Sequence, residues 1–260
     1  MVCSSLIHRF FFNIPGSSFC AQKLEALHRV HRVPQSIKLI TDNMDLQKIY
    51  ATRFIEEALP AKNEIWKVIC TDFFSQFVPK TATVVDMGAG YCEFINNIDC
   101  ERKIAIDLNP DVKKFAHPDV EVINESCLSI QSLTDNSVDI VFMSNFLEHL
   151  LNKQQVFETL QESKRIINHS GKLLILQPNI RFLPNHYWDF FDHHTPLSDR
   201  SLVEALETLD MKIVKCYPRF LPYTTKSKLP KGRFFVKLYL RLPWLWPLFG
   251  KQAFIVAEKR

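Results

Sequence analysis

The chain has 260 residues, of which 47% are hydrophobic and 23% charged, and this balance predicts a globular protein with room for one large α/β domain. Its seven cysteines are scattered and never spaced as a C-x-x-C pair, which argues against a disulfide framework or a zinc site and favours a reducing, cytoplasmic setting. No run of about eighteen apolar residues occurs, so we expect no membrane span, and the net charge of +4 divides into an acidic body and a basic tail, because residues 211–260 hold 12 Lys/Arg and only one acid.

Residues 1–43 carry no periodic pattern of apolar residues. Their Phe-rich run at 6–14 is interrupted by His8, Arg9 and Asn13, so it makes a poor signal peptide. We predict that 1–43 is a disordered extension, or results from a start site placed too early, and that the folded domain spans 44–260.

Helical and strand-like patterns alternate along the rest of the chain. Apolar residues recur every three to four positions over 46–54, 65–77, 156–167 and 201–209. Ser198 or Asp199 can cap the last of these helices, and Gly171 is expected to form a turn before a strand. Short apolar runs predict strands at 83–86, 103–106, 120–123, 138–143, 173–176, 211–216 and 253–257. The alternation predicts a mostly parallel sheet with helices on both faces.

The most informative stretch is 84–94, where a strand ends in Asp86 and opens into a turn that contains Gly88 and Gly90. Small residues let the backbone approach a ligand closely at the carboxyl end of a strand. Asp107 follows the next strand about twenty residues later, where a carboxylate can accept hydrogen bonds from both hydroxyls of a ribose. The glycines and the two acids together predict a cofactor site.

With these motifs the chain resembles the class I, Rossmann-like methyltransferases, and specifically the large bacterial group called methyltransferase type 11. The matching motifs are D-x-G-x-G at 86–90, D-L-N-P at 107–110, and S-V-D-I-V at 137–141 followed by L-E-H-L at 147–150. The resemblance implies a doubly wound α/β sheet of seven strands with a reversed last strand, and S-adenosyl-L-methionine as cofactor. It assigns to the cofactor site Asp86, Gly88, Ala89, Gly90, Asp107, Leu108, Glu125, Ser126 and Asn145.

Two residues of the glycine turn depart from simple patterns. Cys92 stands where the family commonly has Gly, which is tolerable at negative φ and strained at positive φ. Glu93 stands where a dinucleotide-binding G-x-G-x-x-G motif has its third glycine, and a carboxylate near a pyrophosphate is unfavourable. A nicotinamide-dependent oxidoreductase is therefore an alternative that Glu93 disfavours, and a non-catalytic cofactor-binding module is another.

Candidate bases for the methyl acceptor lie beyond the fourth and fifth predicted strands. His149 follows Glu148 at the expected start of a helix, and Asp192 and His193 lie in an aromatic, polar stretch at 187–196 that could cover the site. We predict that the acceptor is deprotonated by His149 or by the 189–194 cluster, with Asp192 and His193 as its catalytic candidates, whereas the simplest alternative for His149 is a helix-terminal histidine bonded to backbone. We expect no metal, because the adjacent rings of His193 and His194 cannot easily turn to one ion.

Residues 218–251 form a basic, aromatic insertion between the last two predicted strands. Its Lys, Arg and aromatic residues at 226–249 suit a peripheral membrane contact at the headgroups, a dimer contact or a cover over an anionic acceptor, although a helix packed on the domain explains them equally well. No nucleic-acid contact is expected, because no recognisable module accompanies the charge. The predicted activity is O-methylation of a small-molecule, sugar or lipid-linked glycan acceptor, in the cytoplasm or at the inner face of the membrane.

Overall fold

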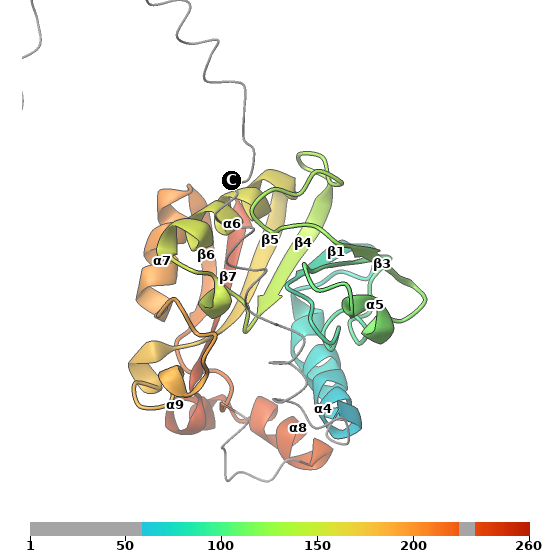
Figure 1. Ribbon diagram of the computed structural model, residues 1–260. Coiled ribbons are helices and arrows are strands. Elements are labelled where there is room, and N and C mark those ends of the chain that lie inside the picture. The colour runs from blue at the N-terminus through green and yellow to red at the C-terminus, as the bar shows by residue number, and fades with distance from the viewer. Residues whose placement is uncertain (1–58, 224–231) are drawn as a thin grey trace, which may run out of the picture. The chain divides into compact units, whose positions relative to one another are not determined.

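The computed structural model describes residues 59–223 and 232–260 (Figure 1). The expected extension at 1–43 and the expected helix at 46–54 lie outside the described residues. So do Lys226, Lys228 and Lys231 of the basic tail.

One sheet of seven strands organises the domain, in the order β3-β2-β1-β4-β5-β7-β6. Strands β1 to β5 run parallel, whereas β7 is antiparallel to both of its neighbours, β5 and β6. This order confirms the predicted α/β fold with a reversed last strand. The strands are β1 Thr83–Met87, β2 Arg102–Ile106, β3 Val120–Ile123, β4 Val138–Ser144, β5 Ile167–Pro178, β6 Met211–Tyr217 and β7 Gln252–Lys259.

Helices connect the strands, and two of them begin at side-chain caps. Asn152 accepts a hydrogen bond from the Gln155 amide at the start of α6, and Ser198 caps α7 as one of the two predicted candidates. The helices are α4 Leu59–Asp72, α5 Val112–Phe115, α6 Lys153–Ile166, α7 Asp199–Thr208, α8 Arg233–Arg241 and α9 Trp246–Phe249. Short 3-10 turns lie at Phe74–Gln76, Leu147–His149, Ile180–Phe182, Tyr187–Asp189 and Pro243–Leu245. None of the described helices is both long and apolar enough to cross a bilayer.

Both faces of the sheet are covered, as the alternating pattern predicts. Val84 packs into one buried cluster with Phe74, Phe142 and Phe254, whereas the next residue, Val85, packs into a second cluster on the other face. The first cluster includes residues of α4 and α8, and the second includes residues of α6 and α7. Because β1 is buried on both faces, its consecutive residues Val84 and Val85 are both apolar instead of alternating with polar residues.

Two predicted boundaries are wrong. The apolar stripe at 65–77 predicts one helix, but α4 ends at Asp72, and Phe73 instead stacks on Phe220 at 4.1 Å between ring centroids. Gly171 does not precede β5 but lies within it, next to Ser170 at φ 66°, where the pairing with β4 shifts register. A local irregularity inside a strand therefore produced the same glycine signal as a turn.

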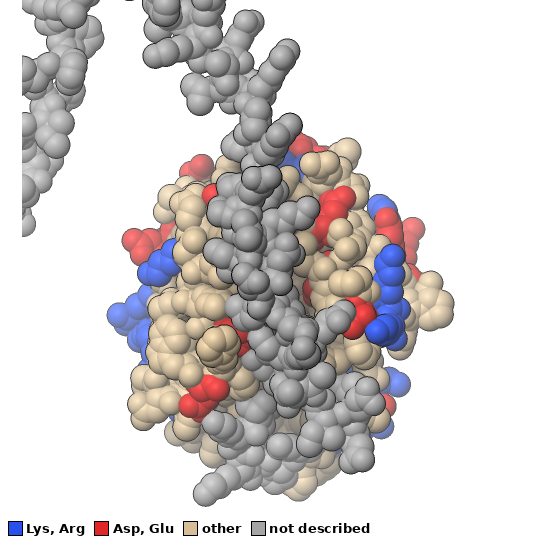
Figure 2. Space-filling model, viewed as in Figure 1, with Lys and Arg blue, Asp and Glu red and all other residues tan. Residues whose placement is uncertain are grey.

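Part of the basic tail is paired with acidic residues of the body. On the face shown in Figure 2, acidic and basic side chains are interspersed. Two basic residues of α8 form ion pairs with acidic residues of α4. Arg233 Nη1 lies 2.9 Å from Glu64 Oε2, and Lys237 Nζ lies 3.3 Å from Asp72 Oδ2. The exposed ion pairs lower the net charge of this surface but contribute little stability.

The register of the sheet brings five loops to one edge. Met87 pairs with Ile106, Ile106 with Ile123, and Ser144 with Leu176, so the loops that follow β1 to β5 open together at the carboxyl edge. Open parallel sheets bind ligands at this edge. The segment after α9 reaches the same edge, because β7 begins with Gln252 opposite Pro178.

Candidate cofactor and acceptor site

The turn after β1 combines two glycines in left-handed backbone conformations. Gly88 has φ 72° and its amide donates to the Ile106 carbonyl at 2.8 Å, which holds the turn against the end of β2. A Cβ at Gly88 would lie 2.4 Å from the Phe146 ring, whereas a Cβ at Gly90, with φ 50°, would meet nothing within 4 Å. Gly88 is thus required for packing, and Gly90 faces open space that a ligand can approach.

Asp107 connects the glycine turn to the end of β2. Its Oδ2 accepts a hydrogen bond from the Gly90 amide at 2.8 Å, and its Oδ1 accepts one from the Asn109 amide at 2.8 Å. Partial burial raises the pKa of Asp107, although these amides oppose the shift. Each carboxylate oxygen retains a lone pair for another donor, and the neighbouring Leu108 is 55% exposed.

Asp86 and Ala89 are buried beneath the turn. Asp86 is only 3% exposed, and burial raises its pKa well above the ordinary value, while a hydrogen bond from the Ile95 backbone opposes the shift. Ala89 is 6% exposed. Both side chains are therefore shielded from solvent, and Gly90 is the residue of this turn that faces open space.

The two unusual residues of the turn behave differently from each other. Cys92 has φ 59° and is fully buried, so it adopts the strained conformation that the sequence left open. Glu93 lies 2.6 Å from Lys62, so its negative charge is paired. The charge argument against a pyrophosphate at this position is therefore weaker than the sequence suggests.

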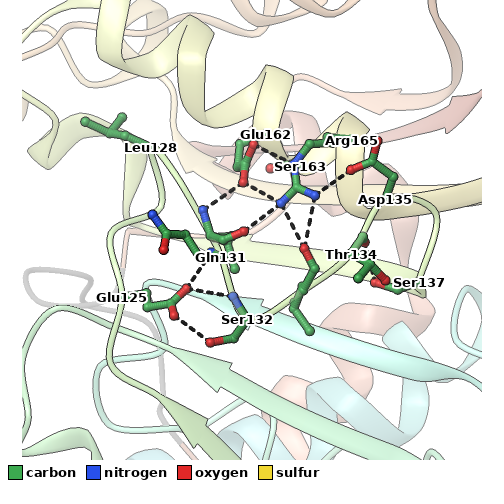
Figure 3. A network of polar contacts seen from close by, with 12 residues as sticks. Glu125, Leu128, Gln131, Ser132, Thr134, Asp135, Ser137, Glu162, Ser163 and Arg165 are labelled. Carbon is green, nitrogen blue, oxygen red and sulfur yellow. Dashed lines mark hydrogen bonds and ion pairs between the residues drawn. The ribbon is translucent and has the colours of Figure 1, made fainter. Parts of the chain in front are cut away.

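Glu125, expected beside the cofactor, holds a neighbouring loop in place (Figure 3). Its Oε2 accepts from the amides of Gln131 and Ser132 at 2.8 and 3.2 Å, and its Oε1 accepts from the Ser132 hydroxyl at 2.5 Å. Arg165 binds the same loop through the Ile130 carbonyl at 2.7 Å. Ser126 likewise caps its own turn, because its hydroxyl accepts from the Leu128 amide at 3.3 Å.

Asn145 directly follows β4 and carries a buried hydrogen-bond acceptor. It has φ 48°, its amide donates to the Leu176 carbonyl at 2.9 Å, and its Nδ2 donates to the Ser144 hydroxyl at 3.0 Å. Its Oδ1 is buried and has no hydrogen-bond partner in the described part of the chain. An orphaned acceptor at the carboxyl edge fits a ligand that brings a donor.

The structure brings the three predicted catalytic residues together. His149 lies in the 3-10 turn Leu147–His149 rather than at the start of a long helix, and its Nδ1 lies 3.1 Å from Asp192 Oδ2 and 3.0 Å from the Asp192 carbonyl. The ring centroids of His149 and His193 lie 5.0 Å apart. Burial lowers the pKa of both histidines, but the Glu148 and Asp192 carboxylates outweigh it at His149 and raise the pKa there.

Glu148 lies at the centre of this group, although its sequence position marks it only as the neighbour of His149. It is 1% exposed, its Oε2 accepts from Gln177 Nε2 at 2.8 Å, and its Oε1 lies 3.9 Å from Nε2 of both His149 and His193. Its carbonyl accepts from the amides of His194 and Thr195, which joins the 192–195 loop to this turn. The sequence signals that could have identified it are an acid beside a histidine and a glutamine ending the apolar run of β5.

We call Glu148, His149, Asp192 and His193 the acceptor cluster. Donor atoms of Glu148, His149 and His193 lie within 4.8 Å of one another, which is a set able to hold a metal ion. His194 is not part of that set. We expected no metal because the adjacent rings of His193 and His194 cannot easily turn to one ion. In the structure, however, His193 lies beside His149, which is distant in the sequence.

Comparisons with known proteins identify the domain. Residues 85–175 match the family model of a methyltransferase domain, type 11, as the sequence motifs predict. No curated protein matches the chain.

Solved structures share the fold at low identity. A SAM-dependent methyltransferase from Archaeoglobus fulgidus is 23% identical, with a TM-score of 0.57 over 76% of this chain and 94% of that one. A Thermotoga maritima SAM-dependent methyltransferase, described as a possible histamine N-methyltransferase, is 16% identical, with a TM-score of 0.56 over 77% and 89%. The [4+2]-cyclase SpnF is 12% identical, with a TM-score of 0.51 over 76% and 80%.

A cyclase among these neighbours means that the fold alone does not fix the reaction. The family match to residues 85–175 is independent of these structures and names methyl transfer. The chain therefore carries an S-adenosylmethionine-dependent methyltransferase domain of the class I fold.

Proposed function

We propose that this domain methylates a hydroxyl oxygen of a small-molecule, sugar or lipid-linked glycan acceptor. The observation that carries the proposal is the acceptor cluster, which lies at the same edge of the sheet as the open glycine turn. Transfer to a hydroxyl requires a group that takes up its proton, because a neutral hydroxyl is a weak nucleophile. The cluster supplies imidazole and carboxylate groups for that task.

The proposed cofactor contacts come from the loops after four strands. Gly90 leaves space for close approach, Asp107 can accept the ribose hydroxyls, and Asn145 Oδ1 can accept one further donor. Leu108, Glu125 and Ser126 complete the wall of the site, with the Glu125 carboxylate acting mainly through the loop that it positions. When bound, S-adenosylmethionine supplies a methyl group already activated on a positively charged sulfur.

Within the acceptor cluster we assign distinct tasks. Asp192 is a positioning residue, because its carboxylate and carbonyl both contact His149 Nδ1 and fix the ring. This leaves His149 Nε2 on the side of Glu148 and His193. We assign uptake of the acceptor's proton to the His149 and His193 side of the cluster.

Exposed apolar side chains in the tail support the proposal that the acceptor is held at a membrane. Of the ten large apolar side chains that are exposed in the described residues, six lie between positions 234 and 249. On α8, Phe234, Phe235 and Leu238 are exposed, whereas Leu240 is buried. Exposed rings beside basic residues suit the headgroup region of an anionic bilayer. We expect a Phe234→Ser/Leu238→Ser variant to lose sedimentation with anionic vesicles; equal sedimentation of the wild type with neutral vesicles would argue against the basic contribution.

The nicotinamide alternative fits the fold less well. A dinucleotide-binding sheet has the order 3-2-1-4-5-6, whereas here the antiparallel β7 lies between β5 and β6. Position 93 also carries a glutamate rather than the third glycine. A non-catalytic cofactor-binding module would have the same fold and would also bind the cofactor. An assay of methyl transfer therefore distinguishes it from an enzyme.

The test uses the full chain, methyl-labelled S-adenosylmethionine and fractionated extract of the source cells. We expect label in a product that survives mild alkali, as an ether does and an ester does not, and that hydriodic acid releases as methyl iodide, as it does from an ether far more readily than from a methylamine. Partition of that product into organic solvent would identify a lipid-linked acceptor, and retention in water a free sugar or metabolite. Asp107→Ala should abolish labelling and His194→Ala should not. Label only in alkali-labile material, or none above heat-denatured protein, would refute the proposal.

A further inference from the structure

We propose that Glu148, His149 and His193 bind one divalent transition-metal ion, with zinc as the best match, at the acceptor side of the site. The inference deepens the proposed function and rests on it only for the role of the ion. The binding itself is argued from the three side chains and their neighbours.

The spacing of the donor atoms fits a shared ion better than direct hydrogen bonds. Glu148 Oε1 lies 3.9 Å from His149 Nε2 and 3.9 Å from His193 Nε2. Hydrogen bonds between such atoms are roughly 2.7–3.2 Å long, whereas ligands around one zinc ion, each at about 2.0–2.2 Å from it, lie roughly 3 to 3.5 Å apart. The two 3.9 Å separations would have to shorten by less than about 1 Å, and all three ligand atoms already lie within 4.8 Å of one another.

Neighbouring groups already orient each of the three ligands. Gln177 donates to Glu148 Oε2 at 2.8 Å and so leaves Oε1 toward the two imidazoles. Asp192 contacts His149 Nδ1, the arrangement by which a carboxylate fixes a metal-binding histidine with its other nitrogen toward the metal. The His193 ring stacks on Phe190 with centroids 4.9 Å apart.

The charge at the cluster also favours a cation. The Glu148 side chain is 1% exposed, and in the described residues its ion-pair partners are the two histidines, with no Lys or Arg among them. A buried carboxylate is costly unless a positive charge compensates it, and at Glu148 that charge comes either from a protonated histidine or from a bound cation. A divalent ion supplies that charge while both imidazoles stay neutral, as ligands must.

The donor set indicates the class of ion. Two imidazole nitrogens and one carboxylate oxygen are the ligands of catalytic zinc and of non-haem iron, whereas calcium and magnesium prefer oxygen alone. Three protein ligands leave a coordination position open. The His149 side chain is 23% exposed and the other two are at most 3% exposed, so solvent or an acceptor oxygen reaches the cluster from the His149 side. With the ion bound, both Nε2 atoms are ligands and take up no proton, so the histidines would act through the ion: it would favour loss of the acceptor's hydroxyl proton to water as the acceptor oxygen gains the methyl group.

The test titrates the chelator-stripped full chain with Zn²⁺ by calorimetry and with Co²⁺ by visible absorption. We expect one ion per chain, and at least a tenfold loss of affinity in Glu148→Gln and in His193→Ala. His194→Ala, the adjacent histidine outside the cluster, should bind as the wild type does. Wild-type protein that binds no zinc, or Glu148→Gln with unchanged affinity, would overturn the inference.

A second measurement covers the case in which a variant does not fold. In wild-type protein, added zinc should shift the imidazole nitrogen resonances of His149 and His193 and leave those of His194 in place; shifts at His194 alone, or none, would overturn the inference. Methyl transfer is measured on the same samples. Zinc binding without transfer would refute the proposed function alone, whereas transfer without zinc binding would refute the metal site alone.

Discussion

The cofactor side and the acceptor side of this edge are built in opposite ways. The cofactor side comes chiefly from one stretch, 86–107, and is held by backbone groups, such as the amide of Gly90 on Asp107 and the amide of Gly88 on Ile106. The acceptor cluster joins residues 148–149, 177 and 192–193 through side chains. A site fixed by backbone conformation tolerates few substitutions for steric reasons, whereas a site fixed by side chains depends on each hydrogen bond.

Alanine substitutions at the two glycines should give the largest change in unfolding free energy, and they test the cofactor side of this comparison. Gly88→Ala places a Cβ 2.4 Å from the Phe146 ring at φ 72°, so overlap and backbone strain together should cost about 3 kcal/mol of unfolding free energy. Gly90→Ala, the matched control, meets no atom within 4 Å and should cost only about 1 kcal/mol. Urea denaturation measures both. Equal losses would show that packing on Phe146 does not determine the identity of residue 88.

A single buried hydroxyl group, with two hydrogen bonds, tests the acceptor side. Tyr187 is fully buried, and its hydroxyl donates to the Thr195 carbonyl at 2.6 Å and accepts from the Leu197 amide at 3.3 Å. Tyr187→Phe leaves both groups without this partner and should cost about 2 kcal/mol. Tyr217→Phe is the control, because the Tyr217 hydroxyl makes no described hydrogen bond, and it should cost under about 0.5 kcal/mol.

The same variant shows whether the two sides are separable. Cofactor affinity in Tyr187→Phe should stay within about twofold of the wild type, because none of the proposed cofactor contacts involves the 187–197 loop. A large loss of affinity would mean that the loop also shapes the cofactor side.

The smallest effect concerns the strained cysteine. Both Cys92→Ala and Cys92→Gly remove the buried thiol, but only glycine relieves the backbone at φ 59°. Glycine at position 92 should therefore be more stable than alanine by about 1 kcal/mol. At an ordinary negative φ the order reverses, so an alanine variant that is the more stable of the two would contradict the conformation described for this turn.

The sequence predicted the parts of the molecule that follow from local patterns. The seven strands, a cap at Ser198 or Asp199, and the placement of Asp107 at the end of the strand after the glycine turn depend on periodicity or on spacing over about twenty residues. The register of a parallel sheet then places the strand ends at one edge without further information.

The rest depended on contacts between distant residues. Nothing near Glu148 in the sequence indicates that Gln177 will bind its carboxylate or that His193 will face it. The turn predicted at Gly171 is instead a shift of strand register, which depends on the pairing of β5 with β4. The cofactor role of Glu125 stays a prediction, to which the structure adds the hydrogen bonds that its carboxylate accepts from the Ser132 loop. The sequence likewise left the φ of Cys92 undetermined.

The most direct test of the cofactor site is calorimetric binding of S-adenosylhomocysteine to wild-type protein, to Asp107→Ala and to the exposed control Asp119→Ala. Asp107 accepts from the Gly90 amide of the glycine turn and from the Asn109 amide of its own loop, so its loss should remove the proposed ribose contacts and the support of Gly90. We predict micromolar affinity, on the order of −8 kcal/mol, in the wild type and in Asp119→Ala, and at least a hundredfold loss in Asp107→Ala. Binding of NADH instead of S-adenosylhomocysteine, or equal affinity in all three proteins, would contradict the account.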